Sequence, residues 1–343
     1  MSNPGYAPMQ REYSKRLGVI DDDQLQTALD RFGLGRLLSA EPAAGGLFGQ
    51  NILLESTEGS FVFRGAPHWN PAGEDDWQFP KERYFARLLA DSASGAPVPW
   101  PYLVDETRGI FGWGYAIMPR LSGLPLLTPA VRPFSDADHD AHATAMALGL
   151  AAVHAVTLPA AGLYHLESDG IRAHDERYGS YVANTVRTLL EACLHASAAT
   201  TRADVTWVEA VIERALPAFD EPFTPSVVHH DFHDGNVLVD DSSGAWRLSG
   251  IIDWMTAEAG DPEADLARYL SHHAQHGPAT GATFLATYQA LRPPRAGFAQ
   301  RFPVFMLWER LLIWEYGQRS GWFPDGLTLR TWAEPFTQML GRL

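Results

Sequence analysis

Residues 229–236 read HHDFHDGN and place three histidines, two aspartates and one asparagine around a glycine. The histidines could supply ligands of a catalytic zinc ion, which needs three protein ligands at compatible spacing. Asp231 and Asn236 could instead serve phosphoryl transfer, where a carboxylate orients the attacking hydroxyl and hard oxygen atoms bind Mg²⁺ beside the phosphates. The sequence has no HExxH motif, and the histidines of the later stretch SHHAQH lie in a segment of helical pattern, which is typical of a polar helix face.

The spacing of the acidic and amide residues favours phosphoryl transfer over zinc hydrolysis. Asp231 and Asn236 stand five residues apart, as in the D-x-x-x-x-N catalytic loop of kinases. Alone this spacing is common, because Asp and Asn also cap turns. Asp253 follows in GIIDW, and the apolar residues before it are typical of a buried strand that ends in a ligand. The order of these segments, completed by GDPEAD, predicts a phosphotransferase.

The stretches VVHHDFHDGNVLVD, GIIDW and GDPEADLARYL resemble the signature segments of the aminoglycoside phosphotransferase family. This protein-kinase-like group also includes choline, homoserine and macrolide kinases. The resemblance implies Asp231 as catalytic base, Asn236 and Asp253 as ligands of Mg²⁺, and ATP as phosphoryl donor. It also implies that His229 and Asp265 brace the catalytic loop by hydrogen bonds, although capping or core packing would explain these two residues equally well.

One residue of the catalytic loop departs from the family pattern. The family usually has glycine between the His and the Asp of this motif, and this chain has His230. Its side chain would lie near the substrate hydroxyl or the loop's own backbone, where it could tune specificity, or it would point to solvent.

The N-terminal part of the chain carries the features expected of a nucleotide site. In AAGGLFGQNILLE, Gly46 and Gly49 could bring backbone N–H groups close to phosphate oxygens, although glycine turns are ordinary. Arg64 in SFVFRG stands where kinases place their phosphate-contacting Lys, and an arginine would neutralise phosphate bidentately. Glu82, early in the next helix, is its expected partner. Lys81 beside it is expected to face solvent and is the alternative cation.

The segment AIMPRLSG matches the connection between the two lobes in this family. The resemblance implies that adenine is held there by the carbonyl of Pro119 and the backbone N–H of Leu121. Proline is compatible with the first contact, which needs only a carbonyl. Met118 would line the base pocket or pack in the core, and both can hold.

The acceptor site is expected in the C-terminal part, where acidic and aromatic groups would recognise a cationic small molecule. Each candidate would otherwise be surface charge or core packing. The polar candidates are His230, Asp234, Glu258, Asp261, Glu309 and Glu315, and the aromatic ones are Trp308, Trp314, Tyr316 and Trp322.

The elements that must position these groups run from strands to helices. An apolar hairpin is expected over residues 50–65, a helix over 79–91 and another strand over 112–123. Helices follow from Ser135, which forms an expected capping box with Asp138, and short strands flank the catalytic loop. The predicted fold is α+β and bilobal like a protein kinase. Residues 1–123 would form a small antiparallel-sheet lobe that binds nucleotide, and residues 124–343 a larger, mostly helical catalytic lobe.

The composition of the chain restricts the classes of molecule that it is expected to bind. The 343 residues carry 41 acidic and 26 basic side chains, a formal net charge of −15 that disfavours nucleic acid and anionic membranes. A single cysteine, Cys193, excludes an internal disulfide, and with no apolar N-terminal segment we expect a cytoplasmic protein, monomeric or weakly dimeric.

The predicted activity is ATP- and Mg²⁺-dependent O-phosphorylation of a small hydroxyl compound, with an aminoglycoside or related antibiotic as the leading acceptor. A metabolite such as choline, homoserine or a sugar is the alternative. A pseudokinase without turnover is a further one, whose hallmark would be loss of Asp231, Asn236 or Asp253; all three are present.

Overall fold

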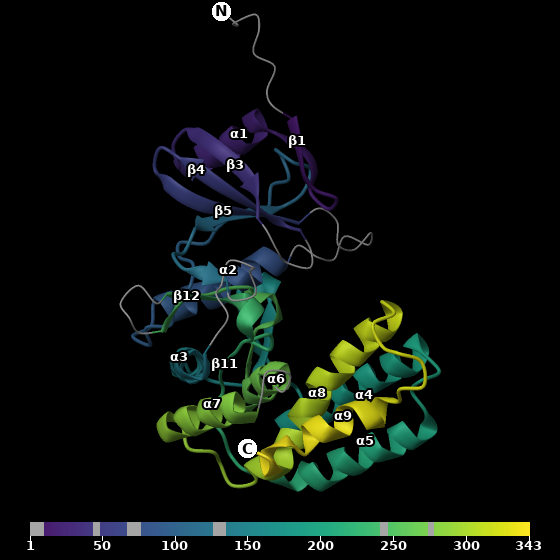
Figure 1. Ribbon diagram of the computed structural model, residues 1–343. Helices are drawn as coiled ribbons and strands as arrows, with labels where there is room; N and C mark the ends of the chain where they lie inside the picture. The colour runs from purple at the N-terminus through teal and green to yellow at the C-terminus, as the bar shows by residue number, and fades with distance from the viewer. Residues whose placement is uncertain (1–9, 44–48, 67–76, 126–134, 241–245, 274–277) are drawn as a thin grey trace, which may run out of the picture.

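The protein is described from a computed structural model, in which an antiparallel sheet lies above a larger body of helices (Figure 1). The α+β class predicted from the sequence is confirmed. No helix in the described part of the chain combines the length and apolar character needed to cross a membrane. The described residues are 10–43, 49–66, 77–125, 135–240, 246–273 and 278–343.

The upper sheet is a five-stranded antiparallel sheet in the order β3-β4-β5-β7-β6. β4 and β5 form the predicted hairpin, with Asn51 paired to Arg64 at one end and Ser56 to Gly59 at the other. A second hairpin and helix α1 precede this sheet. The strands and helix are β1 (Gln10–Ser14), β2 (Gly18–Asp21), α1 (Asp22–Phe32), β3 (Leu37–Pro42), β4 (Asn51–Ser56), β5 (Gly59–Gly65), β6 (Leu103–Asp105) and β7 (Tyr115–Pro119).

The two faces of this sheet bury different sets of side chains, because alternate residues of a strand point to opposite faces. Phe63 of β5 packs with the residues of α1, such as Leu25 and Leu29. On the other face, Val62 and Met118 pack against helix α2 (Gln78–Ala90). Arg64 shares the face of Val62 and is therefore directed toward α2.

The larger body contains the helices α3 (Asp136–His154), α4 (Tyr178–Ala196), α5 (Arg202–Ala215), α6 (Glu263–His273), α7 (Pro278–Leu291), α8 (Phe298–Arg319) and α9 (Leu329–Thr337). Helix α8 packs against α4, α5, α6 and α9, and α3 packs against α7 (Figure 1). The predicted capping box at the start of α3 is confirmed, since Ser135 and Asp138 exchange both bonds. Cys193 is buried in α4, as a small helix residue would be.

Two small sheets sit among these helices and carry the loops of interest. One has the order β10-β9-β14-β11 and the other β13-β12-β8. The sequence predicted the strands that flank residues 229–236, but it missed the hairpin of β9 and β10 and the short β14. Their bounds are β8 (Leu124–Pro125), β9 (Gly162–His165), β10 (Gly170–Ala173), β11 (Ser226–Val228), β12 (Val237–Asp240), β13 (Arg247–Ile251) and β14 (Glu258–Gly260). Short 3₁₀ helices cover Leu166–Ser168, Leu216–Asp220, Asp234–Asn236, Trp254–Thr256 and Met339–Gly341.

The chain passes from the upper sheet to the larger body through a close backbone contact at Gly123. This glycine has φ +107°, and a Cβ there would lie 2.7 Å from the carbonyl oxygen of Val239 in β12. The hydroxyl of Ser249 in β13 donates to the carbonyl of Ser122 at 2.6 Å. The connection is thus held directly against the hairpin that follows the catalytic loop.

Candidate active site

The loop between β11 and β12 holds the side chains of Asp231 and Asn236 together. The amide nitrogen of Asn236 donates to Oδ2 of Asp231 at 2.7 Å and to the Asp231 carbonyl at 3.0 Å. The strands on either side are anchored by Val227, Val228 and Val237, which are buried. The asparagine therefore orients the carboxylate predicted to be the catalytic base.

Asp265 of α6 accepts two hydrogen bonds from the backbone of this loop. Its Oδ2 accepts the N–H of His229 and its Oδ1 accepts the N–H of His230, both at 2.7 Å. His154, at the end of α3, lies 3.0 Å from Oδ2 through Nε2, and its Nδ1 lies 2.7 Å from the hydroxyl of Tyr288. His154 was not predicted from the sequence, because it follows the apolar C-terminal half of α3 and has no motif partner nearby in the chain.

The ring of His229 connects the loop to the strand that leads to Asp253. Nδ1 accepts the N–H of Asp231 at 3.2 Å, so Nε2 carries the proton and donates to the carbonyl of Ile252 at 3.0 Å. Burial lowers the pKa of His229, although Asp265 and Asp231 act in the opposite direction. The ring is thus held as the neutral tautomer that both bonds require.

His230 adopts a left-handed backbone conformation, with φ +60°. Glycine enters this region without strain, which gives a physical reason for the glycine found there in the family. The side chain does not point to solvent. Its Nε2 lies 3.1 Å from Oε1 of Glu258, and its ring stacks on Trp308 with centroids 4.8 Å apart. Burial opposes protonation, but the Glu258 carboxylate raises the pKa of His230 above its usual value.

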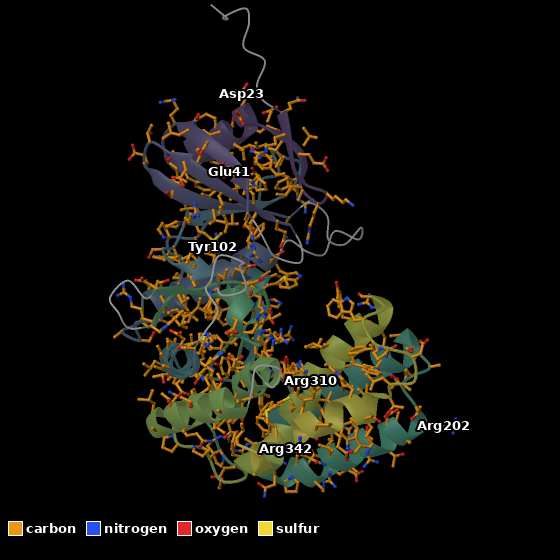
Figure 2. The ribbon with its side chains drawn as sticks, in the orientation of Figure 1. Asp23, Glu41, Tyr102, Arg202, Arg310 and Arg342 are labelled. Carbon is orange, nitrogen blue, oxygen red and sulfur yellow. The ribbon has the colours of Figure 1, made fainter. Side chains whose placement is uncertain are left out.

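Asp253 also has a left-handed backbone, φ +67°, directly after β13. Its Oδ1 accepts from Nη2 of Arg64 at 2.9 Å, and the same nitrogen lies 3.2 Å from Oε1 of Glu82. Glu82 is buried and held by Gln78 at 2.9 Å and by the hydroxyl of Tyr102 at 2.7 Å. Tyr102 lies where the upper sheet meets the larger body (Figure 2). The Arg64 guanidinium therefore links an aspartate of the larger body to α2.

Asn236 and Asp253 are brought together by the β12–β13 hairpin. Val237 pairs with Ile251, and the N–H of Ile252 donates to the carbonyl of Asn236 at 3.0 Å. An amide oxygen and a carboxylate are the hard ligands that Mg²⁺ takes together with substrate phosphates and water. Among the described residues, no group of three or more His, Cys, Asp or Glu side chains is arranged to hold a metal, so the histidine zinc cage finds no support there.

The expected nucleotide residues are distributed along the upper sheet and the connection. Gly49 has φ +57°, and its carbonyl accepts from the hydroxyl of Ser14 at 2.6 Å. Gly46 lies outside the described residues. Met118 is buried between the sheet and α2, and Pro119 pairs with Phe61 in the neighbouring strand. The side chain of Leu121 packs against β13, because its Cδ1 lies 2.8 Å from where a Cβ of Gly250 would be.

Lys81 does not face solvent as predicted. It is partly buried, and its ammonium lies 5.3 Å from the centre of the Trp77 ring. Burial lowers the pKa of Lys81 to about 8, although the carboxylates of Glu258 and Glu82 act in the opposite direction. The expectation failed because it treated the start of α2 as an exposed helix end, whereas the buried first turn packs between the sheet and the larger body.

A second cation, Arg268, contacts Asp231 and was not predicted. Its Nη2 lies 2.5 Å from Oδ1 of Asp231, and its Nη1 lies 3.4 Å from Oε2 of Glu309 in α8. Nε2 of His233 lies 3.4 Å from the same Oδ1. Burial would raise the pKa of Asp231, but the contact with His233 and the charge of Arg268 outweigh it and lower the pKa. The sequence signal was present, because Arg268 follows Asp265 by three residues and so shares its helix face.

With this geometry established, comparison with known proteins gives the family. The model of the phosphotransferase enzyme family, APH, matches residues 39–298, well over half of the chain. The chain belongs to this family. The resemblance inferred from the three signature stretches is confirmed.

Individual phosphotransferases of the family are distant in sequence. Viomycin phosphotransferase from Streptomyces vinaceus is 44% identical over 57 residues, which are 16% of this chain and 20% of that relative. The chain therefore matches only a fifth of the length of this curated relative.

Solved structures match over nearly the full length. A thermostable mutant of aminoglycoside phosphotransferase APH(4)-Ia, in ternary complex with AMP-PNP and hygromycin B, aligns with a TM-score of 0.64 at 17% identity, covering 92% of this chain and 98% of that one. A provisionally assigned fructosamine-3-kinase from Thermobifida fusca aligns with a TM-score of 0.62 at 20% identity, covering 93% and 99%. At these identities the similarity establishes the fold, which is that of kinase-like phosphotransferases.

Not all predicted acceptor residues of this phosphotransferase gather near Asp231. His230, Glu258, Trp308 and Glu309 do, through the contacts given above. Asp234 sits in the catalytic loop, but it is buried and its Oδ1 lies 3.4 Å from Nε2 of His142.

Other predicted acceptor residues have structural tasks. Asp261 is fully buried, accepts the N–H of Glu263 at the start of α6 and pairs with Arg295; burial and the Glu263 carboxylate raise its pKa to about 6. Glu315 pairs with Arg319 one turn along α8. The remaining aromatic candidates are a core residue, Trp314, and an edge-to-face pair, Tyr316 and Trp322. The sequence does not distinguish acceptor-binding residues from residues that pack or pair within the fold, because both groups are acidic and aromatic residues in helical segments.

Proposed function

We propose that the protein transfers the γ-phosphoryl group of ATP, with Mg²⁺, to a hydroxyl of a small molecule, and that an aminoglycoside or related antibiotic is the leading acceptor. The observation that carries this proposal is the joint placement of two groups. Asp231 is oriented by Asn236 on a loop held at its backbone, and Asp253, which follows β13 of the adjacent hairpin, accepts a hydrogen bond from Arg64. Phosphoryl transfer needs mainly such positioning and charge neutralisation.

Residues 1–123 would serve as the nucleotide-binding lobe. Arg64 would contact phosphate oxygens while Glu82 holds it in place, which is supported by their 3.2 Å separation and by the burial of both side chains. Gly49 would let the backbone approach the phosphates. The base would lie against Met118, with the Pro119 carbonyl and the Leu121 N–H as its hydrogen-bond partners.

Asn236 and Asp253 would hold Mg²⁺ through one amide oxygen and one carboxylate. When bound, this ion neutralises charge on the phosphate oxygens. The fit is supported by the donor chemistry, because Mg²⁺ prefers oxygen ligands and takes its remaining positions from phosphates and water. Arg64 lies 2.9 Å from Asp253 and supplies an opposite charge to it.

Residues 124–343 would form the catalytic and acceptor-binding lobe. Asp231 would accept a hydrogen bond from the acceptor hydroxyl and take its proton as the new P–O bond forms and the bond to the leaving ADP breaks. Since its pKa is lowered, orientation of the hydroxyl contributes more than basicity. The ring of His230, the residue before Asp231, stacks on Trp308 of α8, and the two rings offer a flat surface for a sugar or a cationic group.

Three observations support an antibiotic as the acceptor. The curated relative is a viomycin phosphotransferase, and a structural neighbour was solved with hygromycin B. The net charge of −15 would attract a cationic compound. The alternative acceptor is a metabolite such as choline, homoserine or a sugar; the fructosamine-3-kinase neighbour favours a sugar derivative among these. A pseudokinase is disfavoured because Asp231, Asn236 and Asp253 are all present and placed together.

The test is incubation with ATP, Mg²⁺ and a panel of aminoglycosides, peptide antibiotics, macrolides, amino alcohols and glycated amines. Mass spectrometry would detect an added phosphate on the acceptor. Phosphorylation of an antibiotic supports the leading acceptor class, and phosphorylation of a metabolite alone supports the alternative. No phosphorylated product, together with no detectable nucleotide binding, would reject the proposal.

A further inference from the structure

We propose that Arg268, held by Glu309, is a positioning residue that fixes the Asp231 carboxylate for attack by the acceptor hydroxyl. This inference rests on the proposed phosphotransferase function. It concerns a cation on α6, three residues after Asp265, to which the sequence analysis assigned no role.

Two ion pairs connect Asp231, Arg268 and Glu309, which lie on three different elements. Asp231 lies on the loop after β11, Arg268 on α6 and Glu309 on α8, with Arg268 lying 2.5 Å from the first carboxylate and 3.4 Å from the second. The side chains of Arg268 and Glu309 are only 14% and 4% exposed. A buried carboxylate that lost its partner would carry a large desolvation cost, so each member of the chain holds the next in place.

Helix α6 uses one face for two different contacts with the loop. Asp265 accepts the backbone N–H groups of His229 and His230, and Arg268, three residues later, contacts the side chain of Asp231. Residues three apart in a helix lie on one face. Asp265 therefore fixes where the loop backbone runs, and Arg268 fixes the direction of the carboxylate that the backbone presents.

The contacts also select which carboxylate oxygen meets the acceptor. A carboxylate oxygen offers two lone-pair positions. Those of Oδ1 are directed to Arg268 and His233, whereas Oδ2 accepts from Asn236 in the described part of the chain. The acceptor hydroxyl would then donate to the second position of Oδ2. Without Arg268, the carboxylate could rotate and present either oxygen.

Arginine suits this task better than lysine would. Two different nitrogens of one planar guanidinium reach Asp231 and Glu309. A lysine has a single nitrogen and cannot hold both carboxylates in the same fixed geometry. Arg268→Lys should therefore keep the charge and recover only part of the positioning.

The experiment measures steady-state kinetics of Arg268→Ala, Arg268→Lys and Glu309→Gln on whichever acceptor the wild-type chain phosphorylates. Misplacement of a reacting group by about 1 Å costs on the order of 10²-fold in rate. We expect kcat of Arg268→Ala to fall by that factor while KM for ATP and for the acceptor change little. Guanidinium ion, added below denaturing concentration, should restore part of the lost kcat.

Arg310→Ala is the matched control, because Arg310 is also a buried arginine between α6 and α8 (Figure 2). Its guanidinium donates to the hydroxyl of Ser271 at 2.7 Å and lies over the ring of Phe336, and these contacts do not involve the catalytic loop. Loss of a buried arginine should lower the melting temperature of both alanine variants. Only Arg268→Ala should lose kcat per folded molecule and respond to guanidinium.

Several outcomes would overturn the inference. One is an Arg268→Ala enzyme with wild-type kcat; another is a fall in kcat that Arg310→Ala matches and guanidinium does not rescue. If Arg268→Ala does not fold, a wild-type kcat in both Arg268→Lys and Glu309→Gln would also overturn the inference. ATP hydrolysis without an acceptor is measured in parallel. A wild-type chain that neither transfers phosphate nor hydrolyses ATP would reject the proposed function, whereas an active wild type with an equally active Arg268→Ala rejects only the role of Arg268.

Discussion

Asp265→Asn changes one atom of the residue that holds the catalytic loop. In the structure both oxygens of this fully buried carboxylate accept backbone N–H groups at 2.7 Å, from His229 and His230, and Oδ2 also contacts His154. An asparagine keeps one of these acceptors. Its NH₂ group must face either the N–H of His230 or the N–H of His229 together with His154. In both orientations one hydrogen bond to the loop is lost.

The expected cost follows from these two bonds. A hydrogen bond to a charged group contributes about 1.5–3 kcal/mol, and a buried N–H left without a partner costs about 1–3 kcal/mol. The free energy of unfolding should therefore fall by about 2.5–6 kcal/mol, the sum of these two contributions. The freed N–H belongs to His229 or His230, and His230 has a strained left-handed backbone that these bonds help to hold. Relaxation there would move Asp231, and a displacement of about 1 Å would lower kcat by on the order of 10²-fold.

Asp204→Asn provides a matched control on α5. Asp204 is also buried and also accepts two backbone N–H groups, from Thr201 at 2.7 Å and Arg330 at 2.8 Å, far along the chain from the catalytic loop. Urea denaturation should show a similar loss of stability in both variants, and kinetic assays of the folded enzymes should show lost kcat only in Asp265→Asn. Equal kcat in the two variants would refute the idea that Asp265 positions the loop.

Two further predictions concern the ion pairs around the site. His230→Asn keeps a residue that tolerates φ +60° but removes the titratable ring. The pKa of His230 is raised in the folded state, so the stability that the wild type gains from its pair with Glu258 should be complete below about pH 6.5. This stability should be lost as the pH rises through the folded-state pKa. Urea denaturation at several pH values would check this, and a difference between the two proteins that does not shrink at high pH would contradict it. Glu82→Gln removes one partner of Arg64, so KM for ATP should rise by about 10-fold or more, the equivalent of one charged hydrogen bond. Glu55→Gln is the control, because Glu55 forms an exposed pair in β4, and this variant should leave KM for ATP unchanged. Equal KM values in the two variants would contradict the role of Glu82.

The sequence predicted the parts of this site that lie on local motifs. The five-residue spacing of Asp231 and Asn236 and the apolar lead-in to Asp253 depend on short stretches, and the structure brings these three residues together. The pairing of Arg64 with Glu82 could be anticipated because strand periodicity and helix position restrict where each can point.

The contacts missed from the sequence all connect distant segments. His154 reaches Asp265 from α3, and nothing in its local sequence indicates this contact. Arg268 shares a helix face with Asp265, but its contact with Asp231 depends on how α6 packs against the loop. Lys81 was misplaced for a related reason, since its burial depends on the larger body covering the start of α2. For Asp261 the partner decides the role, and Arg295, which is distant in the chain, could not be identified as that partner from the sequence. Glu315 and Arg319 are four residues apart, a helical spacing at which an ion pair could have been expected.

The central claim is that Asp231 orients the acceptor hydroxyl and takes its proton during phosphoryl transfer. Asp231→Asn preserves the size of the side chain and removes its ability to take a proton, so it tests the claim most directly. Transfer to the acceptor, followed by mass spectrometry, should fall by about 10²–10⁴-fold, while calorimetric titration shows AMP-PNP and Mg²⁺ binding as in the wild type. A variant that transfers phosphate at a near-normal rate would contradict the account.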